Sequence, residues 1–221
     1  AERLAKGNNK EAKAEVELAR KILPHLDAGR AAIEFDFAGD EREVARRWFL
    51  LSLKPTLFAC NVAESDLTNS EKLGAVQAVM SFAEGHAGSE AVVISARIEA
   101  ELAELSDADA AEYLKSLGVL ESGVGRLIRT AYHLLGLRTF FTAGEKEARA
   151  WTIHKGDTAP QAAGVIHSDF ERGFIRAETV AYEELVRTGS MAAAREKGLV
   201  RQEGKEYVVA DGDVMLFKFN V

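Results

Sequence analysis

The amino-acid sequence predicts an α/β unit that is preceded by a helical hairpin and followed by an α+β unit. Residues 1–27 carry apolar side chains at three- and four-residue steps, the pattern of a helix with one apolar face. Two apolar runs, at 56–60 and 91–94, flank a helical segment and match a crossover between buried parallel strands. From Leu137 onwards apolar and polar residues alternate, which is typical of strands with one buried face.

The first part, residues 1–50, is expected to form two antiparallel helices. The first helix should end just before Gly29, which is expected to adopt the left-handed conformation of a helix C-terminus. Its apolar stripe is expected to consist of Ala12, Val16, Ala19, Leu23 and Leu26. A second helix should begin at Asp40, where Glu43 three residues later completes a capping-box pattern. Its helical spacing is carried by Val44, Trp48 and Leu51. The pair is either an ordinary packed hairpin or a short coiled-coil arm that contacts a macromolecule.

The second part, residues 51–136, contains the strand–helix–strand unit and further helices. The first strand starts at Thr56 and ends in Asn61-x-x-Glu64, a helix is expected over 70–84, and the second strand ends at Ser95. Because crossovers between parallel strands are right-handed, both strand ends lie at one edge of the sheet, where open α/β sheets bind ligands. Two parallel strands alone do not form a stable sheet, so either strands from a preceding part of the protein complete it or the unit is unstable by itself. The two polar strand ends together have the form of a nucleotide-base pocket.

The third part, residues 137–221, is expected to be a β-grasp domain, in which a curved sheet holds one helix. A hairpin, a helix and further strands follow one another within about 84 residues. The helix should begin around Thr158, because a polar cap and an early proline, Pro160, occur there. A second short helix is expected over 190–197. The expected strands are 138–142, 148–153, 173–180, 207–209 and 214–219.

Composition argues against several classes of protein. The net charge of −7 argues against a nucleic-acid footprint over the whole surface. The one cysteine, Cys60, lies in an apolar run, so we expect a buried side chain, no disulfide framework and a reducing cytoplasm. The five histidines lack the spacing of a zinc site, and no apolar stretch of roughly 18 residues occurs, so we expect no metal centre and no membrane segment. We also expect a monomer. Three acidic residues are expected to be solvated rather than to bind metal: Glu99, Glu101 and Glu104.

Six sequence blocks resemble the YchF family of Obg-like P-loop NTPases, and the resemblance covers essentially the whole chain. The most specific block is 169–178, Asp-Phe-Glu-Arg-Gly-Phe-Ile-Arg-Ala-Glu. The others are 60–64, 94–101, 137–144, 150–153 and 159–164. The layout of the family is a nucleotide-binding domain with an inserted coiled-coil arm, followed by a TGS domain of β-grasp type. The resemblance assigns 1–50 to the arm, 51–136 to the C-terminal half of the nucleotide-binding domain and 137–221 to the TGS domain.

The phosphate-binding motif of P-loop proteins does not occur in this sequence. No Gly-x-x-x-x-Gly-Lys-Ser/Thr is present, and the nearest glycine pairs, Gly85 with Gly88 and Gly123 with Gly125, are not followed by Lys-Ser/Thr. The residues that would hold Mg²⁺ in such proteins are missing as well. In the family these elements precede the arm, and the chain opens without Met, so we expect it to start inside a longer protein. It is expected to contain no catalytic residue and not to hydrolyse nucleotide by itself.

The resemblance implies that the base of ATP or GTP binds at Asn61-x-x-Glu64, with Mg²⁺ held outside this chain. Ordinary GTPases read guanine with Asn-Lys-x-Asp, in which the lysine lies over the base and the aspartate accepts its hydrogen bonds. Here Val62 removes that cation and Glu64 is one methylene longer, which implies relaxed or ATP-preferring selectivity. Asn61 should fix the loop and Val62 should contact the base, whereas the role of Glu64 stays open. Ser95 and Ala96 should complete the pocket. In the alternative interpretation Asn61 only caps a turn and Glu64 is an exposed surface residue.

The parent protein is then expected to be a cytoplasmic NTPase that couples ATP or GTP hydrolysis to a ribosome or RNA-associated partner. Three basic residues, Lys155, Arg172 and Arg176, could form an RNA-binding face of the TGS domain, with Phe170 or Phe174 nearby for stacking. Equally, Phe174 could be a core residue. The main alternative is a non-catalytic ribosome- or RNA-binding adaptor, in which the nucleotide half is a scaffold. A third possibility is a fragment of a TGS-bearing synthetase or alarmone enzyme.

Overall fold

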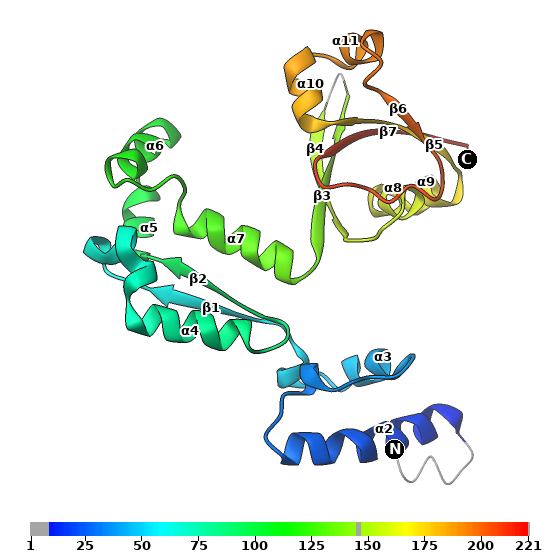
Figure 1. Ribbon diagram of the computed structural model, residues 1–221. Helices are drawn as coiled ribbons and strands as arrows, with labels where there is room; N and C mark the ends of the chain where they lie inside the picture. The colour runs from blue at the N-terminus through cyan, green and yellow to red at the C-terminus, as the bar shows by residue number, and fades with distance from the viewer. Residues whose placement is uncertain (1–8, 145–146, 221) are drawn as a thin grey trace. The chain divides into compact units, whose positions relative to one another are not determined.

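The computed structural model describes residues 9–144 and 147–220 of the chain. The contacts divide the chain into an N-terminal unit, residues 1–134, and a C-terminal unit, residues 135–221. Each unit is described by itself, and Figure 1 shows their elements. None of the helices in the described part of the chain has the length and apolar character needed to cross a bilayer.

The N-terminal unit begins with a long helix and a short one. Helix α2 (Lys10–Asp27) is capped by the side chain of Asn9, which accepts a hydrogen bond from the amide of Ala12 at 3.2 Å. Helix α3 (Glu41–Arg46) contacts α2, and Lys21 Nζ lies 2.5 Å from Glu41 Oε1. Two single 3₁₀ turns lie between and after them, η1 (Ala32–Glu34) and η2 (Leu51–Leu53). Gly29 has φ +76°, as predicted for the end of the first helix.

The predicted apolar stripe of α2 is wrong by part of a turn. The buried residues are Ala12, Leu18, Ile22 and His25, whereas Leu23 is 53% exposed. A polar side chain decides the buried face, because His25 Nε2 is 2.8 Å from the carbonyl of Ala31 and its ring meets Phe35 edge-on. A pattern search over apolar residues alone could not include a histidine in the stripe.

The second helix is much shorter than predicted. The side chain of Asp40 makes no capping bond, and Glu41 instead accepts the amide of Ala38 at 3.0 Å. The helix ends at Arg46, and Phe49 has a positive φ of 54°, which interrupts the helical spacing before Leu51. A helix of six residues cannot carry the heptads of a coiled coil. The described residues therefore hold a packed pair of unequal helices.

The strand–helix–strand unit follows the prediction closely. Strand β1 (Thr56–Asn61) pairs in parallel with β2 (Ser89–Ile94), and the register sets Asn61 opposite Ile94 at the strand ends. The connecting helix α4 (Gly74–Glu84) starts four residues later than predicted, because the preceding segment forms the 3₁₀ turns η3 (Glu64–Lys72). Cys60 is half-buried rather than buried, since β1 has one partner strand among the described residues.

Three helices complete the N-terminal unit: α5 (Ala96–Leu102), α6 (Asp107–Ser116) and α7 (Gly123–Leu134). Two of the three glutamates that were predicted to be solvated have partners, whereas Glu104 is exposed as predicted. Glu99 Oε1 accepts the amide of Gly123 at 2.7 Å, and Glu101 Oε2 accepts the hydroxyl of Tyr113 at 2.6 Å. No group of three or more His, Cys, Asp or Glu side chains that could hold a metal ion occurs in the described residues.

The C-terminal unit is a five-stranded mixed sheet with helices on both faces (Figure 1). The strand order is β4-β3-β7-β5-β6, and the central pair β3–β7 is parallel while the other pairs are antiparallel. The strands are β3 (Leu137–Ala143), β4 (Ala148–His154), β5 (Phe174–Ala181), β6 (Arg201–Glu203) and β7 (Asp213–Phe219). The helices are α8 (Ala159–Ile166), α9 (Ser168–Arg172), α10 (Tyr182–Thr188) and α11 (Met191–Glu196).

Successive side chains of β7 point to opposite faces of the sheet, and both faces are packed against helices. Met215 and Phe217 point to the larger cluster with Phe140, which helix α8 covers. Val214 points to the other face, where a smaller cluster includes Ala194 of α11. Helix α8 begins as predicted: Gln161 accepts the Thr158 amide at 2.8 Å. The predicted strand at 207–209 is wrong, because only an isolated bridge from Val208 to Thr158 is formed there.

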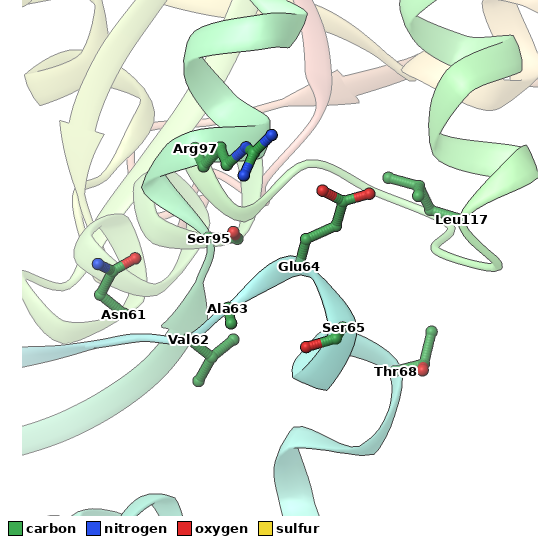
Figure 2. Close-up of a pocket in the computed structure, with 9 residues that line it drawn as sticks. All are labelled: Asn61, Val62, Ala63, Glu64, Ser65, Thr68, Ser95, Arg97 and Leu117. Atoms are coloured by element: carbon green, nitrogen blue, oxygen red, sulfur yellow. The ribbon is translucent and has the colours of Figure 1, made fainter.

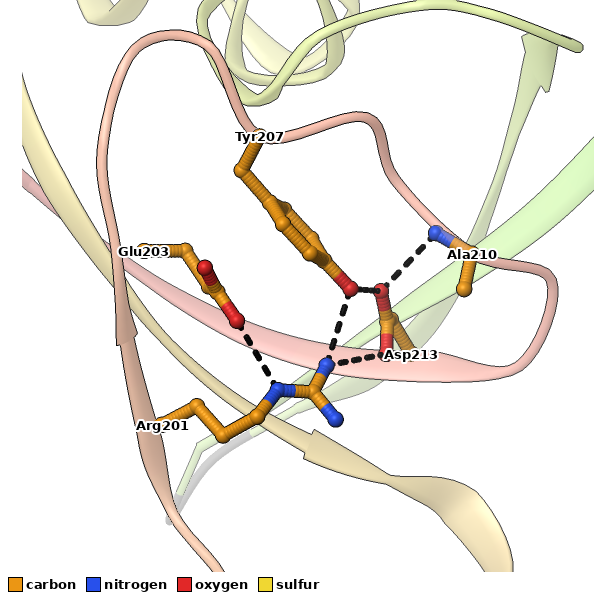
Figure 3. Close-up of polar contacts among 5 residues, drawn as sticks. All are labelled: Arg201, Glu203, Tyr207, Ala210 and Asp213. Atoms are coloured by element: carbon orange, nitrogen blue, oxygen red, sulfur yellow. Dashed lines mark hydrogen bonds and ion pairs between the residues drawn. The ribbon is translucent and has the colours of Figure 1, made fainter.

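A buried polar cluster holds the 204–212 loop against the start of β7 (Figure 3). The Asp213 carboxylate is 2% exposed and accepts the Tyr207 hydroxyl at 2.7 Å and the Ala210 amide at 2.9 Å. Arg201 Nη2 lies 3.3 Å from Asp213 Oδ1 and 2.8 Å from the Tyr207 hydroxyl, and its Nε lies 2.8 Å from Glu203. Burial, followed by the hydrogen bond to Asp213, raises the pKa of Tyr207 to about 12.

Candidate nucleotide-base pocket

The carboxyl ends of β1 and β2 are tied together by one side-chain hydrogen bond. Asn61 Oδ1 accepts the amide of Ala96, the first residue of α5, at 2.9 Å. Beside it the amide of Val62 donates to the carbonyl of Ile94 at 2.9 Å, which extends the parallel ladder by one bond. The side chain of Asn61 therefore holds the end of β1 to the start of α5, and its predicted role at a nucleotide base stays a prediction.

A cavity of about 740 Å³ opens at these strand ends. This volume lies within the range of roughly 300–1,000 Å³ found for small-molecule sites. Figure 2 shows the nine lining residues: Asn61, Val62, Ala63, Glu64, Ser65, Thr68, Ser95, Arg97 and Leu117. Four of the five residues predicted for the pocket line it, and Ala96 contributes its amide to Asn61 instead.

The polar groups at this cavity have the capacity to bind a ligand. Ser95 is 2% exposed, and its hydroxyl has no hydrogen-bond partner, although buried hydroxyls are normally paired. Glu64 lies at the start of η3, and its carboxylate makes no ion pair with another described residue. Together with Asn61 they offer hydrogen-bond donors and acceptors to a polar heterocycle.

Five lining residues were not predicted from the sequence, and Arg97 is the charged one among them. It stands in the first turn of α5, and its Nε donates to Glu101 Oε1 at 3.3 Å. Glu101 is held in turn by the hydroxyl of Tyr113, and these bonds, Tyr113 first and Arg97 second, lower the pKa of Glu101. The available sequence signal was its place two residues beyond the Ser95 strand end.

Comparison with known proteins shows which chains this one is similar to. The family model YchF-GTPase_C, described as a protein of unknown function (DUF933), matches residues 137–220. The ribosome-binding ATPase YchF of Bacillus subtilis is 47% identical over 219 residues, which span 99% of this chain and 60% of that protein. The protein of the same name from Escherichia coli O157:H7 is 45% identical over 98% of this chain and 59% of its own length. The chain belongs to the YchF family. It covers the C-terminal part of that family and spans about 60% of the length of these relatives.

Solved structures support the YchF assignment over most of the chain. The structure of the Schizosaccharomyces pombe YchF GTPase matches 93% of this chain and 55% of its own, with a TM-score of 0.78 and 32% identity. A GTP-binding protein from Pyrococcus horikoshii matches 94% of this chain with a TM-score of 0.53 and 18% identity, which supports the fold alone.

The predicted basic face of this YchF chain is not assembled by the structure. Lys155 directly follows β4, beside the first residues of β3. Arg176 pairs with Lys218 near the last residues of β7, which lie at the opposite end of the sheet. Arg172 is 77% exposed and pairs with Asp169 on its own helix. Of the two predicted stacking residues, Phe174 is buried in the core and Phe170 is stacked on Phe219 at 3.8 Å between ring centroids.

Proposed function

We propose that this chain provides the base-binding part of a nucleotide-hydrolysing protein of the YchF family. The observation that carries the proposal is the Asn61–Ala96 hydrogen bond, which joins two strand ends beside a cavity of about 740 Å³. Glu64 and the unpaired hydroxyl of Ser95 supply polar groups beside it. The proposed ligand is ATP or GTP, with Asn61 fixing the loop and Val62 contacting the base.

The triphosphate and Mg²⁺ would be held by residues outside those described here. No cluster of three or more His, Cys, Asp or Glu side chains occurs in the described residues. The sequence also holds no P-loop motif. We therefore assign no catalytic residue to this chain and place the hydrolytic step in the full-length protein. A non-catalytic adaptor that binds the ribosome or RNA is the second proposal, and the name of the relatives, ribosome-binding ATPase, favours it.

We further propose a domain assignment that follows the family layout. Residues 1–50 would belong to the arm, 51–136 to the nucleotide-binding domain and 137–221 to a TGS domain of β-grasp type. The support for the last is a mixed sheet with a parallel central pair and helix α8 on one face. The proposed setting is the cytoplasm, with a monomer that contacts the ribosome, since the relatives are named ribosome-binding ATPases.

Replacing Asn61 with alanine in the full-length protein tests the base pocket. Loss of the bond to Ala96 frees the start of α5 and opens the joined strand ends, so the affinity for ATP is expected to fall about tenfold, as for loss of about 1.4 kcal/mol. Isothermal titration calorimetry measures the affinity. The matched control is Asn69→Ala, an exposed asparagine of η3 outside the cavity lining. Unchanged ATP affinity in Asn61→Ala would remove the assignment.

A basic pair on the sheet is the proposed ribosome contact. Arg176 and Lys218 lie opposite each other on β5 and β7, and neither forms an ion pair with another described residue. Like charges at such positions repel, and an RNA phosphate would relieve this repulsion. The nearby Glu178 is buried and bonded to Arg195, which is the main cause of its lowered pKa, with a smaller effect of Lys218.

The double substitution Arg176→Ala with Lys218→Ala is expected to weaken co-sedimentation of the chain with purified ribosomes. Removal of two phosphate contacts should reduce the slope of log affinity against log salt by about 2. Lys155→Ala is the matched control, because this exposed lysine lies at the other end of the sheet. Equal loss in the control, or no loss in the double variant, would contradict a contact through this pair.

A further inference from the structure

The base pocket carries one positive side chain among its nine lining residues, and neither the Asn61 bond nor the Val62 contact involves it. This side chain is Arg97, and Glu64 is the one acidic residue of the same lining. In Figure 2 the charged ends of Arg97 and Glu64 extend towards the same side of the pocket, with Val62 on the side away from Arg97. Arg97 therefore brings the one cation of the lining to the same side of the pocket as the Glu64 carboxylate.

Arg97 is held in place by a chain of two hydrogen bonds. Tyr113 of α6 donates to Glu101, and Glu101 accepts Nε of Arg97. The bond at Nε occupies one donor of the guanidinium and restricts the orientation of its plane, while the two Nη groups remain free of described partners. An arginine with 77% side-chain exposure would otherwise sample many rotamers. The tether therefore reduces the entropy that Arg97 loses when a ligand binds.

The position of Arg97 compensates for a residue that the base loop lacks. In the Asn-Lys-x-Asp pattern of ordinary GTPases the cation over the base comes from the second residue, which is Val62 here. Arg97 provides a cation from the other strand end instead. Guanidinium planes stack on the faces of nucleobases, and stacking tolerates different bases because each has a π-face.

We propose that Arg97 stacks its guanidinium on the bound purine, with Val62 on the opposite face, and that it strengthens ATP and GTP binding equally. The inference rests on the proposed base pocket. It assigns selectivity between the two bases to Glu64 and the loop, and general base affinity to Arg97. Glu101 and Tyr113 are positioning residues that act through Arg97.

The test is isothermal titration calorimetry of the full-length protein with ATP and with GTP. Arg97→Ala is expected to weaken both by the same factor, about three- to tenfold, as for loss of a cation–π contact. Arg97→Lys keeps the charge but loses the plane and should recover only part of the affinity. Tyr113→Phe should weaken binding in the wild type but not in the Arg97→Ala background. Arg42→Ala, which removes an exposed arginine of α3, serves as the control.

Three results would overturn the inference. The first is unchanged affinity in Arg97→Ala. The second is a change of the ATP-to-GTP ratio by more than about threefold, which would mean contact with a base edge. The third is full recovery by Arg97→Lys, which would mean a simple charge effect. Asn61→Ala in the same assay separates the two proposals: if it weakens binding and Arg97→Ala does not, the base pocket stands and the stacking role falls.

Discussion

Replacing Asp213 with alanine is expected to lower the free energy of unfolding of the C-terminal unit by about 3 kcal/mol. The substitution leaves the Tyr207 hydroxyl and the Ala210 amide without their acceptor at a site that is 2% exposed. Arg201 keeps Glu203, so most of the loss comes from those two donors. Urea unfolding, followed by Trp151 fluorescence in a Trp48→Phe background, measures the change in this unit alone.

Tyr207→Phe is the companion variant to Asp213→Ala. It is also expected to change how the free energy of unfolding depends on pH. Because the folded-state pKa of Tyr207 is about 12, against 10.0 in the unfolded chain, its contribution to stability is complete below pH 10. It is lost as the pH rises from about 10 to about 12, since the unfolded phenol then releases its proton first. Tyr207→Phe should abolish this alkaline loss. An identical pH profile for the variant and the wild type would contradict the described cluster.

Gly173→Ala is expected to destabilise the same unit by about 2 to 3 kcal/mol. A Cβ atom at Gly173 would overlap the backbone carbonyl of Asn220, whose own amide donates to the Gly173 carbonyl at 2.9 Å. Backbone cannot rotate away as a side chain can, so β5 and β7 must separate where they meet. The same urea assay measures the effect.

Gly204→Ala is the matched control for Gly173. A Cβ atom there meets nothing within 4 Å and the residue does not need a positive φ, so the change should stay within about 0.5 kcal/mol. Equal effects of the two alanine substitutions would show that the end of β7 does not press against Gly173.

The strand ends could be predicted because their signals are local. A continuous apolar run that stops at Asn61 indicates both a buried strand and its end, and the β1–β2 register agrees with that reading. The Thr158 helix start was equally local, since its cap and proline are neighbours in sequence. These features needed no knowledge of distant residues.

The errors concern residues whose role depends on distant partners. His25 joins the buried face of α2 because of Ala31 and Phe35, and Arg97 enters the pocket through the path of α5. The grouping of Lys155 with Arg176 failed because β7, the last strand in the sequence, lies between β3 and β5 and separates their ends. The positions of charged residues along the sequence do not reveal the order of the strands in the sheet, and that order decides which charges lie together.

The central place of β7 has a consequence for synthesis of the protein. Strands β3 and β5 are both made before residue 182, yet they cannot pair with each other, because the strand that joins them is 213–219. Until residues 213–219 have emerged from the ribosome, the two half-sheets lack the strand that joins them and leave apolar faces and strand edges exposed. Folding of this unit follows translation of residue 219, and a ribosome that stalls before that point displays an incomplete sheet with open edges.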